Sequence, residues 1–184
     1  MESHPYKGNN ADIERIANSF RDAVFQRVGE EVLRGRKLLE TTVSLMGGRI
    51  QLVDDPSRQE VEGGSLIIRS ERDFTIYLSP YTTPLRDNFT IAHEVGHLLL
   101  HFCLQNPKRQ TPVGFTRYGS GSLEWQANRF AAALLMPELE FREKHTAYGG
   151  DRFLLSGFFE VSRPAVEARA ESLGCTCRSV SSNG

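Results

Sequence analysis

The sequence has few cysteines and no long hydrophobic run. Its three cysteines, Cys103, Cys175 and Cys177, are an odd and unevenly spaced set that excludes a disulfide framework. No stretch approaches the roughly 18 to 20 apolar residues that cross a bilayer. The opening residues Met-Glu-Ser-His-Pro-Tyr-Lys also lack the apolar core of a secretion signal. We therefore expect a cytoplasmic protein with no membrane partner.

The chain also lacks an excess of charge of either sign. Lys plus Arg number 22 and Asp plus Glu number 23, which gives a formal net charge of -1 at pH 7. Without a basic excess there is no general attraction to nucleic acid, so we expect no direct nucleic-acid partner. Hydrophobic residues at 39% and charged residues at 24% are typical of a globular protein. From the length of 184 residues we expect one domain over 1–174 and a flexible tail over 175–184.

The order of hydrophobic patterns predicts an α+β fold. Short segments rich in β-branched and aromatic residues, separated by turn residues, predict three strands at 49–53, 65–69 and 74–78. Apolar residues at helical spacing predict helices at 11–28, 30–46, 83–102, 122–136, 137–145, 151–159 and 163–173. Proline and glycine between 104 and 121 predict a long surface loop. We expect the small three-stranded sheet to pack on the helix over 83–102.

The helix predicted over 83–102 carries His93-Glu94-Val95-Gly96-His97, an H-E-x-x-H motif. On a helix, residues four apart lie on one face, so both imidazoles can bind one metal ion. A carboxylate at Glu94 can take a proton from water activated by that metal and pass it to a leaving amine, as in zinc peptidases. The motif therefore predicts His93 and His97 as ligands and Glu94 as the catalytic base.

The surroundings of the motif favour a metal site over ordinary core histidines. Apart from His93, Glu94, His97 and His101, residues 89–102 are almost entirely apolar or glycine, so this helix should be buried on nearly all sides. An unpaired buried charge costs several kcal/mol, and metal binding removes that cost. The donor set predicts one zinc ion (Zn2+) per chain.

A catalytic zinc site normally has three protein ligands and a fourth position for water. His101 lies eight residues after His93, a rise of about 12 Å on a straight helix. Zn–N bonds of about 2 Å cannot bridge that distance, so we interpret His101 as a residue that supports the ligands or the structure. Glu124, at the start of the next predicted helix, is the better third ligand.

The neighbours of Glu124 support this interpretation. Asn128 follows one helical turn later, where its amide oxygen can accept the free N–H of a ligating imidazole and fix the tautomer. The small residues Ala127, Ala131 and Ala132 would let this helix approach the His93 helix closely.

Two strings of the sequence resemble the ImmA/IrrE metallopeptidases, which are gluzincins with a zincin-like fold. The strings are Phe89-Thr90-Ile91-Ala92-His93-Glu94-Val95-Gly96-His97-Leu98-Leu99-Leu100-His101 and Glu124-Trp125-Gln126-Ala127-Asn128-Arg129-Phe130-Ala131-Ala132-Ala133-Leu134-Leu135-Met136-Pro137. With a weaker similarity at 159–169, the resemblance covers about 74–174. It implies His93, His97 and Glu124 as zinc ligands and Glu94 as the catalytic residue.

The resemblance also implies a substrate class. Members of this family are bacterial or phage proteins that inactivate helix-turn-helix repressors of the Xre type, often by cleaving them. Their action switches on mobile elements or stress-response genes. We therefore expect the partner to be a repressor encoded near this gene. The resemblance matches no transition-state stabiliser, for which Tyr118 and His145 are candidates by residue type.

Three other interpretations stay open. The protein could bind and sequester a repressor without cutting it, although Glu94 has no part in metal binding and so favours catalysis. The stretch over 161–169 reads like a recognition helix of a DNA-binding regulator, but the chain lacks the basic excess that such binding requires. Cys175 and Cys177 could form part of a second metal site, for which a single C-x-C is a weak signal.

Overall fold

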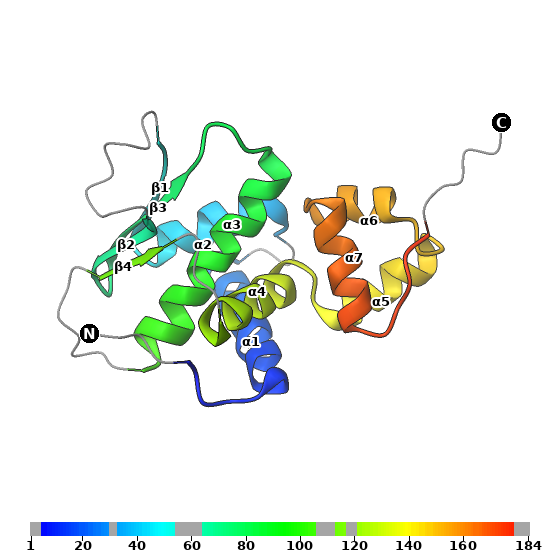
Figure 1. Cartoon of the computed structure of the whole chain (residues 1–184), viewed down its shortest axis with the longest axis horizontal. Coiled ribbons are helices and arrows are strands. Elements are labelled where there is room, and N and C mark those ends of the chain that lie inside the picture. Colours follow the sequence, from blue (N-terminus) through cyan, green and yellow to red (C-terminus); the bar gives the residue numbers. More distant parts are fainter. Residues whose placement is uncertain (1–4, 30–32, 54–63, 106–112, 117–120, 179–184) are drawn as a thin grey trace.

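The structure is a computed structural model that describes residues 5–29, 33–53, 64–105, 113–116 and 121–178. Over these residues the chain forms seven α-helices, one π-helical segment and one four-stranded sheet (Figure 1). The elements are α1 (Asn10–Val28), α2 (Gly35–Leu45), β1 (Gly48–Leu52), β2 (Gly64–Ser70), β3 (Asp73–Leu78), α3 (Pro84–Gly96), the π-helical segment (His97–Cys103), β4 (Val113–Thr116), α4 (Ser122–Leu135), α5 (Glu138–Ala147), α6 (Arg152–Phe159) and α7 (Arg163–Ser172). The predicted α+β class is confirmed.

The sheet is mixed, with strand order β1-β3-β2-β4. β1 runs parallel to β3, whereas β2 runs antiparallel to both β3 and β4. All three predicted strands are present, and β4 adds an edge strand from within the segment that we expected to be a surface loop. β4 has only four residues, and one of them is Gly114. A segment this short gives too weak a sequence pattern to predict a strand.

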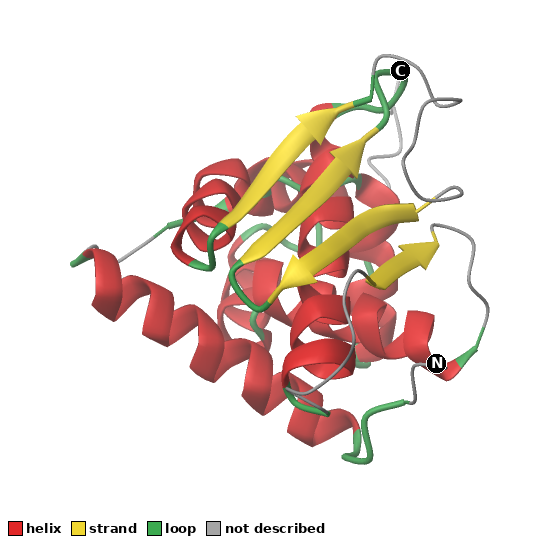
Figure 2. Ribbon diagram, turned by 90° about the vertical axis from the view of Figure 1, so that its left-hand side faces the viewer, coloured by secondary structure: helices red, strands yellow, loops and turns green. Residues whose placement is uncertain are grey.

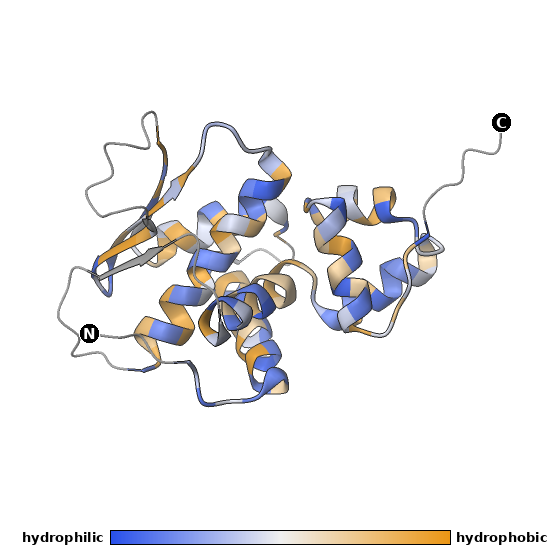
Figure 3. Ribbon diagram, viewed as in Figure 1, coloured by the Kyte–Doolittle hydropathy of each residue, from blue (hydrophilic) through white to orange (hydrophobic). Residues whose placement is uncertain are grey.

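The sheet lies against a layer of helices (Figure 2). Apolar residues of the strands and of α3 and α4 form one buried cluster. Figure 3 shows hydrophobic segments on these elements. Phe74, Ile76 and Leu66 contribute the strand side of this core, and Ile91, Val95 and Phe130 contribute the helix side. The helix that carries the H-E-x-x-H motif is thus buried against the sheet, as predicted.

Helices α5, α6 and α7 gather on one side of the molecule (Figure 1). The buried residues Phe141 and Phe159 stack at 5.6 Å between ring centroids, and both belong to the same core cluster as the strands. Arg169 of α7 is only 1% exposed, and its guanidinium bonds to the Met136 carbonyl and to both carboxylate oxygens of Glu14 in α1. This arginine therefore anchors α7 to the body of the protein and has no surface to offer to a phosphate.

Part of the expected C-terminal tail is packed on α7 and the turn before α6. The Cys175 amide donates to the Ala170 carbonyl, and the Arg178 amide donates to the Gly150 carbonyl, both at 2.8 Å. The cysteines Cys103, Cys175 and Cys177 are all free thiols. Among the described residues, no helix has the length and apolar character to cross a bilayer.

Candidate metal centre

The helix that carries the motif begins as predicted and ends differently. Thr83 is its N-cap, accepts a hydrogen bond from the Arg86 amide, and is followed by Pro84 in the first turn. We expected helix to about residue 102, and the α-helical form ends at Gly96, after which His97–Cys103 is π-helical. π-Helical turns often occur at functional sites. Here the π-helical segment begins at His97, one of the predicted ligands.

The structure brings His93, His97 and Glu124 together. Nε2 of His93 lies 3.0 Å from Nε2 of His97, and each of these nitrogens faces one carboxylate oxygen of Glu124, at 3.2 Å and 3.1 Å respectively. The two histidines come from adjacent turns around the end of α3, whereas Glu124 reaches over from the first turn of α4. These three residues form a candidate metal site.

The spacing of these atoms fits a tetrahedral zinc ion. Bonds of about 2.0 to 2.1 Å at tetrahedral angles place neighbouring ligand atoms about 3.3 Å apart. The two Nε2 atoms are 3.0 Å apart, Nε2 of His93 lies 3.2 Å from Oε2 of Glu124, and Nε2 of His97 lies 3.1 Å from Oε1, so whichever oxygen binds lies at a suitable distance from one of the two nitrogens. Two imidazoles and one carboxylate also suit zinc chemically, and they leave a fourth position for water.

The charges at the site favour a cation between these groups. Burial alone would raise the pKa of Glu124, but its hydrogen bonds with His93 and His97 and the charges of both rings lower that pKa to about 2. Burial alone would lower the pKa of His93, but Glu124 and the nearby Glu94 outweigh it and raise that pKa. The carboxylate of Glu124 is therefore ionised and attracts positive charge to the histidine pair.

Glu94 is almost fully buried beside the group, with 2% of its surface exposed. Burial raises the pKa of Glu94, an effect that His93, His97 and a hydrogen bond from Ser65 partly oppose. Its Oε1 accepts that bond from the Ser65 hydroxyl at 2.5 Å. Its Oε2 has no hydrogen-bond partner among the described residues. A buried carboxylate oxygen without a partner is costly, and it is available to take a proton from water.

Asn128 lies where we predicted it. Its Oδ1 is 2.9 Å from Nδ1 of His93, so the imidazole donates its Nδ1–H there and keeps the lone pair of Nε2 for a metal. His101 is fully buried, and its Nδ1 lies 3.0 Å from Nδ1 of His97. His101 therefore contacts the side of the His97 ring that faces away from Glu124 and is not one of the grouped ligand atoms. Both residues contact a ligand ring, and their role in supporting the ligands stays a prediction.

Two supporting residues were missed in the sequence. Ser65 comes from β2, and Gln126 comes from α4, where its Oε1 lies 3.0 Å from Nε2 of His101. Nothing local in the sequence ties Ser65 to Glu94, because the two are brought together only by the packing of β2 on α3. Gln126 stands between Glu124 and Asn128, and this position is the only signal that could have identified it.

Only one of the two candidate transition-state stabilisers, His145, lies among the described residues. Tyr118 lies outside the described residues. His145 is in α5, where its Nε2 bonds to the Thr176 carbonyl at 3.0 Å and its ring lies beside Phe141. The role of a stabiliser in either residue stays a prediction.

Close packing of α4 on α3 lets Glu124 reach the histidines. A Cβ atom at Gly96 would lie 3.2 Å from both Cα and O of Ala127, so a side chain there would require the two helices to shift by a few tenths of an ångström. Ala127 is one turn after Glu124 on α4, and Gly96 is next to His97. The contact between Gly96 and Ala127 thus fixes how near the carboxylate comes to the imidazoles.

A comparison with protein families gives one match over this part of the chain. The model of peptidase family M78, described as the IrrE N-terminal-like domain, matches residues 59–171. The match covers more than half of the chain and includes His93, His97 and Glu124. A comparison with curated proteins gave no match.

Proposed function

The chain belongs to the ImmA/IrrE family of M78 metallopeptidases, and from this premise we propose that it is a zinc-dependent endopeptidase that cleaves a helix-turn-helix repressor. His93, His97 and Glu124 would hold the zinc ion. The inactivated repressor would release the genes of a mobile element or a stress response. The observation that carries the zinc assignment is the convergence of the Nε2 atoms of His93 and His97, from α3 and the π-helical segment, on the carboxylate of Glu124 from α4.

The side chains around the candidate metal site have different roles in peptide hydrolysis. When bound, zinc supplies a Lewis acid that lowers the pKa of water and polarises a carbonyl. Glu94 accepts the proton of the attacking water on its unpartnered Oε2 and passes it to the leaving amine. Ser65 holds the other oxygen and thereby orients the carboxylate. Asn128 accepts the Nδ1–H of His93 and so directs Nε2 of that ring toward the metal group.

The sheet offers an approach for an extended substrate. β4 is an edge strand, and it pairs with β2 at Gly64 and Leu66, on either side of Ser65. The Ser65 hydroxyl in turn contacts Glu94, so this edge lies close to the catalytic carboxylate. An extended peptide can add to an exposed strand edge through main-chain hydrogen bonds. A flexible or partly unfolded segment of a repressor would meet this requirement better than a folded one.

The test is cleavage of a small helix-turn-helix repressor encoded beside this gene. The zinc-loaded protein should cut the repressor into two defined fragments, visible by mass spectrometry. A chelator should stop the reaction. Glu94→Gln should reduce the rate by about 100-fold or more, because general base catalysis typically contributes at least that factor. The variant should still bind zinc and repressor, since Glu94 is not among the grouped ligand atoms.

Two other outcomes would contradict the proposal. If the repressor stays intact with zinc present, yet leaves its operator when the proteins are mixed, the protein acts by sequestration. If the purified protein itself shifts random duplex DNA in a salt-dependent way, it acts as a DNA-binding regulator.

A further inference from the structure

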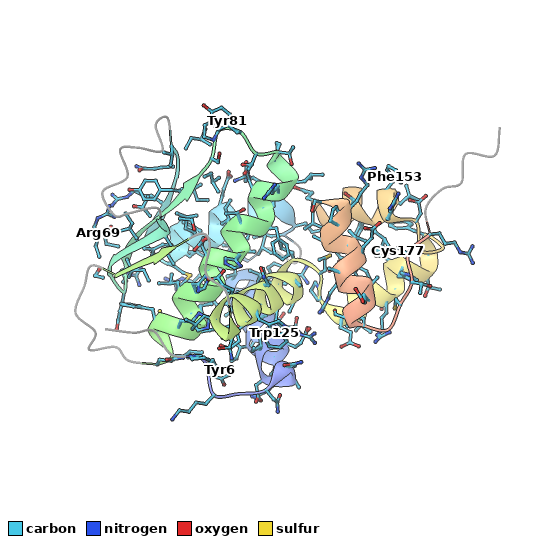
Figure 4. The ribbon with its side chains drawn as sticks, viewed as in Figure 1. Tyr6, Arg69, Tyr81, Trp125, Phe153 and Cys177 are labelled. Atoms are coloured by element: carbon cyan, nitrogen blue, oxygen red, sulfur yellow. The ribbon has the colours of Figure 1, made fainter. Side chains whose placement is uncertain are left out.

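A chain of hydrogen bonds leads from the N-terminal segment to His97. The Tyr6 main chain makes two bonds of 2.8 Å with the side-chain amide of Gln126, its N–H donating to Oε1 and its carbonyl accepting from Nε2. Oε1 of Gln126 also lies 3.0 Å from Nε2 of His101. Nδ1 of His101 lies 3.0 Å from Nδ1 of His97, whose Nε2 belongs to the metal group. Figure 4 shows Tyr6 near the start of α4, which carries Gln126.

The direction of this chain is set by the main chain of Tyr6. A peptide N–H can only donate, and a peptide carbonyl can only accept. The Gln126 amide therefore has one orientation that satisfies both, with Oε1 toward the Tyr6 N–H and Nε2 toward the Tyr6 carbonyl. Because Oε1 is only an acceptor, the nitrogen of His101 that faces it must donate.

The same donor and acceptor rules determine which ring nitrogen carries the proton in His101 and then in His97. A neutral imidazole that donates from Nε2 accepts at Nδ1. His97 must then donate from its own Nδ1, and in the neutral ring this keeps the lone pair of Nε2 for a metal. Without a metal, Nε2 faces the carboxylate of Glu124 at 3.1 Å and can share a proton with it. The opposite tautomer of His97 would place a proton where the metal binds. His97, His101 and Gln126 are all at least 94% buried, so a mismatched donor or acceptor in this chain would be costly.

We propose that Tyr6, Gln126 and His101 are positioning residues that hold His97 in the tautomer that binds metal, so that the N-terminal segment helps to set the affinity for zinc. The proposal rests on the metal site of the proposed function. Tyr6 lies outside residues 59–171, so this contribution comes from a part of the chain beyond the match to the family.

The first test measures the zinc dissociation constant of the full chain by competition with a chromophoric chelator. Gln126→Leu and His101→Leu should each weaken zinc binding by about 10- to 100-fold, as expected for residues that orient a metal-binding histidine. The double variant should be no weaker than the worse single variant, because both break one chain. Tyr6→Pro, which removes the N–H, should weaken binding, whereas Tyr6→Phe should not.

A matched variant separates hydrogen bonding from packing. His101→Gln can present an amide oxygen to Nδ1 of His97, so it should bind zinc more tightly than His101→Leu. A purely structural role would give the reverse order, because leucine fits an apolar surrounding better than an amide does. That reverse order, or additive losses in the double variant, would overturn the proposal.

The second test needs no zinc and no substrate. The side-chain 15N chemical shifts of His97 in the zinc-free protein report which ring nitrogen carries the proton. The wild type should show the Nδ1–H form, and Gln126→Leu should show a mixture. Equal shifts in both proteins would overturn the relay and leave the proposed function standing. Failure of the wild type to bind zinc would instead reject the proposed function.

Discussion

The hydroxyl of Ser65 donates a hydrogen bond of 2.5 Å to Oε1 of Glu94. This contact joins β2 to α3 and makes the two oxygens of one buried carboxylate different. Oε1 is held, and Oε2 has no partner among the residues that the structure describes. Through Ser65, the sheet therefore orients the carboxylate of Glu94, the proposed base, and also supports α3, which carries it.

Removal of this hydroxyl should slow catalysis without loss of metal. We expect Ser65→Ala to lower kcat for the repressor by roughly tenfold or more, because a hydrogen bond to a charged group contributes about 1.5 to 3 kcal/mol. Ser65→Thr keeps the hydroxyl and should retain more activity. Zinc content by atomic absorption should be the same in all three proteins. A variant that loses zinc along with activity would show that Ser65 instead supports the fold of the metal site.

The three grouped residues should differ from His101 in metal content. We expect His93→Ala and His97→Ala to abolish bound zinc, because each removes one of three protein ligands. His101→Ala should still bind one zinc ion per chain at saturating zinc, although with weaker affinity. The measurement is metal analysis after dialysis against buffered zinc. If His101→Ala alone empties the site under saturation, His101 is itself a ligand and the assignment of Glu124 must be reconsidered.

His101 should contribute stability to the metal-free protein that rises with pH between about 4 and 6.5, whereas the raised pKa values of His93 and Glu94 act in the opposite direction. Burial lowers the pKa of His101 from 6.5 to about 4. Between these values the unfolded chain binds a proton that the folded chain does not, so the stability present above pH 6.5 is lost as pH falls toward 4. The pKa difference corresponds to about 3 kcal/mol.

Urea unfolding in the presence of a chelator, at pH 5.0, 6.0 and 7.0, measures this dependence. Glu124 protonates well below this range, since its pKa is about 2 in the folded protein. His101→Leu removes the buried base and should flatten the curve relative to the wild type. Parallel curves for the two proteins would contradict the expectation.

Enlargement of Gly96 should weaken both the fold and the metal site. A side chain there meets the main chain of Ala127 at 3.2 Å, so α4 must move away from α3. We expect Gly96→Val to cost about 1 to 3 kcal/mol in the free energy of unfolding, as overpacked sites do. It should also lower zinc affinity, because Glu124 moves with α4.

A matched control is available in α6. A Cβ atom at Gly157 would meet nothing within 4 Å, so Gly157→Ala should be neutral or stabilising by up to about 1 kcal/mol. Thermal unfolding and zinc titration of both variants provide the comparison. Unchanged zinc affinity in Gly96→Val would show that the approach of the two helices does not govern the site.

The parts of the site that could be predicted are residues at helical spacing within one segment of the chain. His93 and His97 lie on one face because they are four residues apart, and Asn128 follows Glu124 by the same interval. Such local relationships do not depend on how the rest of the chain folds. The fold class was equally accessible, because the three strand patterns and the long helices were distinct.

Contacts between segments far apart in sequence could not be predicted. Ser65 meets Glu94 and Tyr6 meets Gln126 only because β2 and the N-terminal segment pack where they do. No local pattern encodes either pair. The π-helical turn after Gly96 was also missed, since residues 97–103 are apolar enough to suit either kind of helix.

Glu124 reaches the histidines from a different helix, so a metal bound to all three residues would cross-link the two helices. Binding to the folded state alone adds stability by mass action, about 4 kcal/mol when free zinc exceeds the dissociation constant 1,000-fold. Zinc would then raise the melting temperature and slow proteolysis of the whole chain. Starvation for zinc would both silence such an enzyme and hasten its degradation, so that the amount of protein and its activity would fall together.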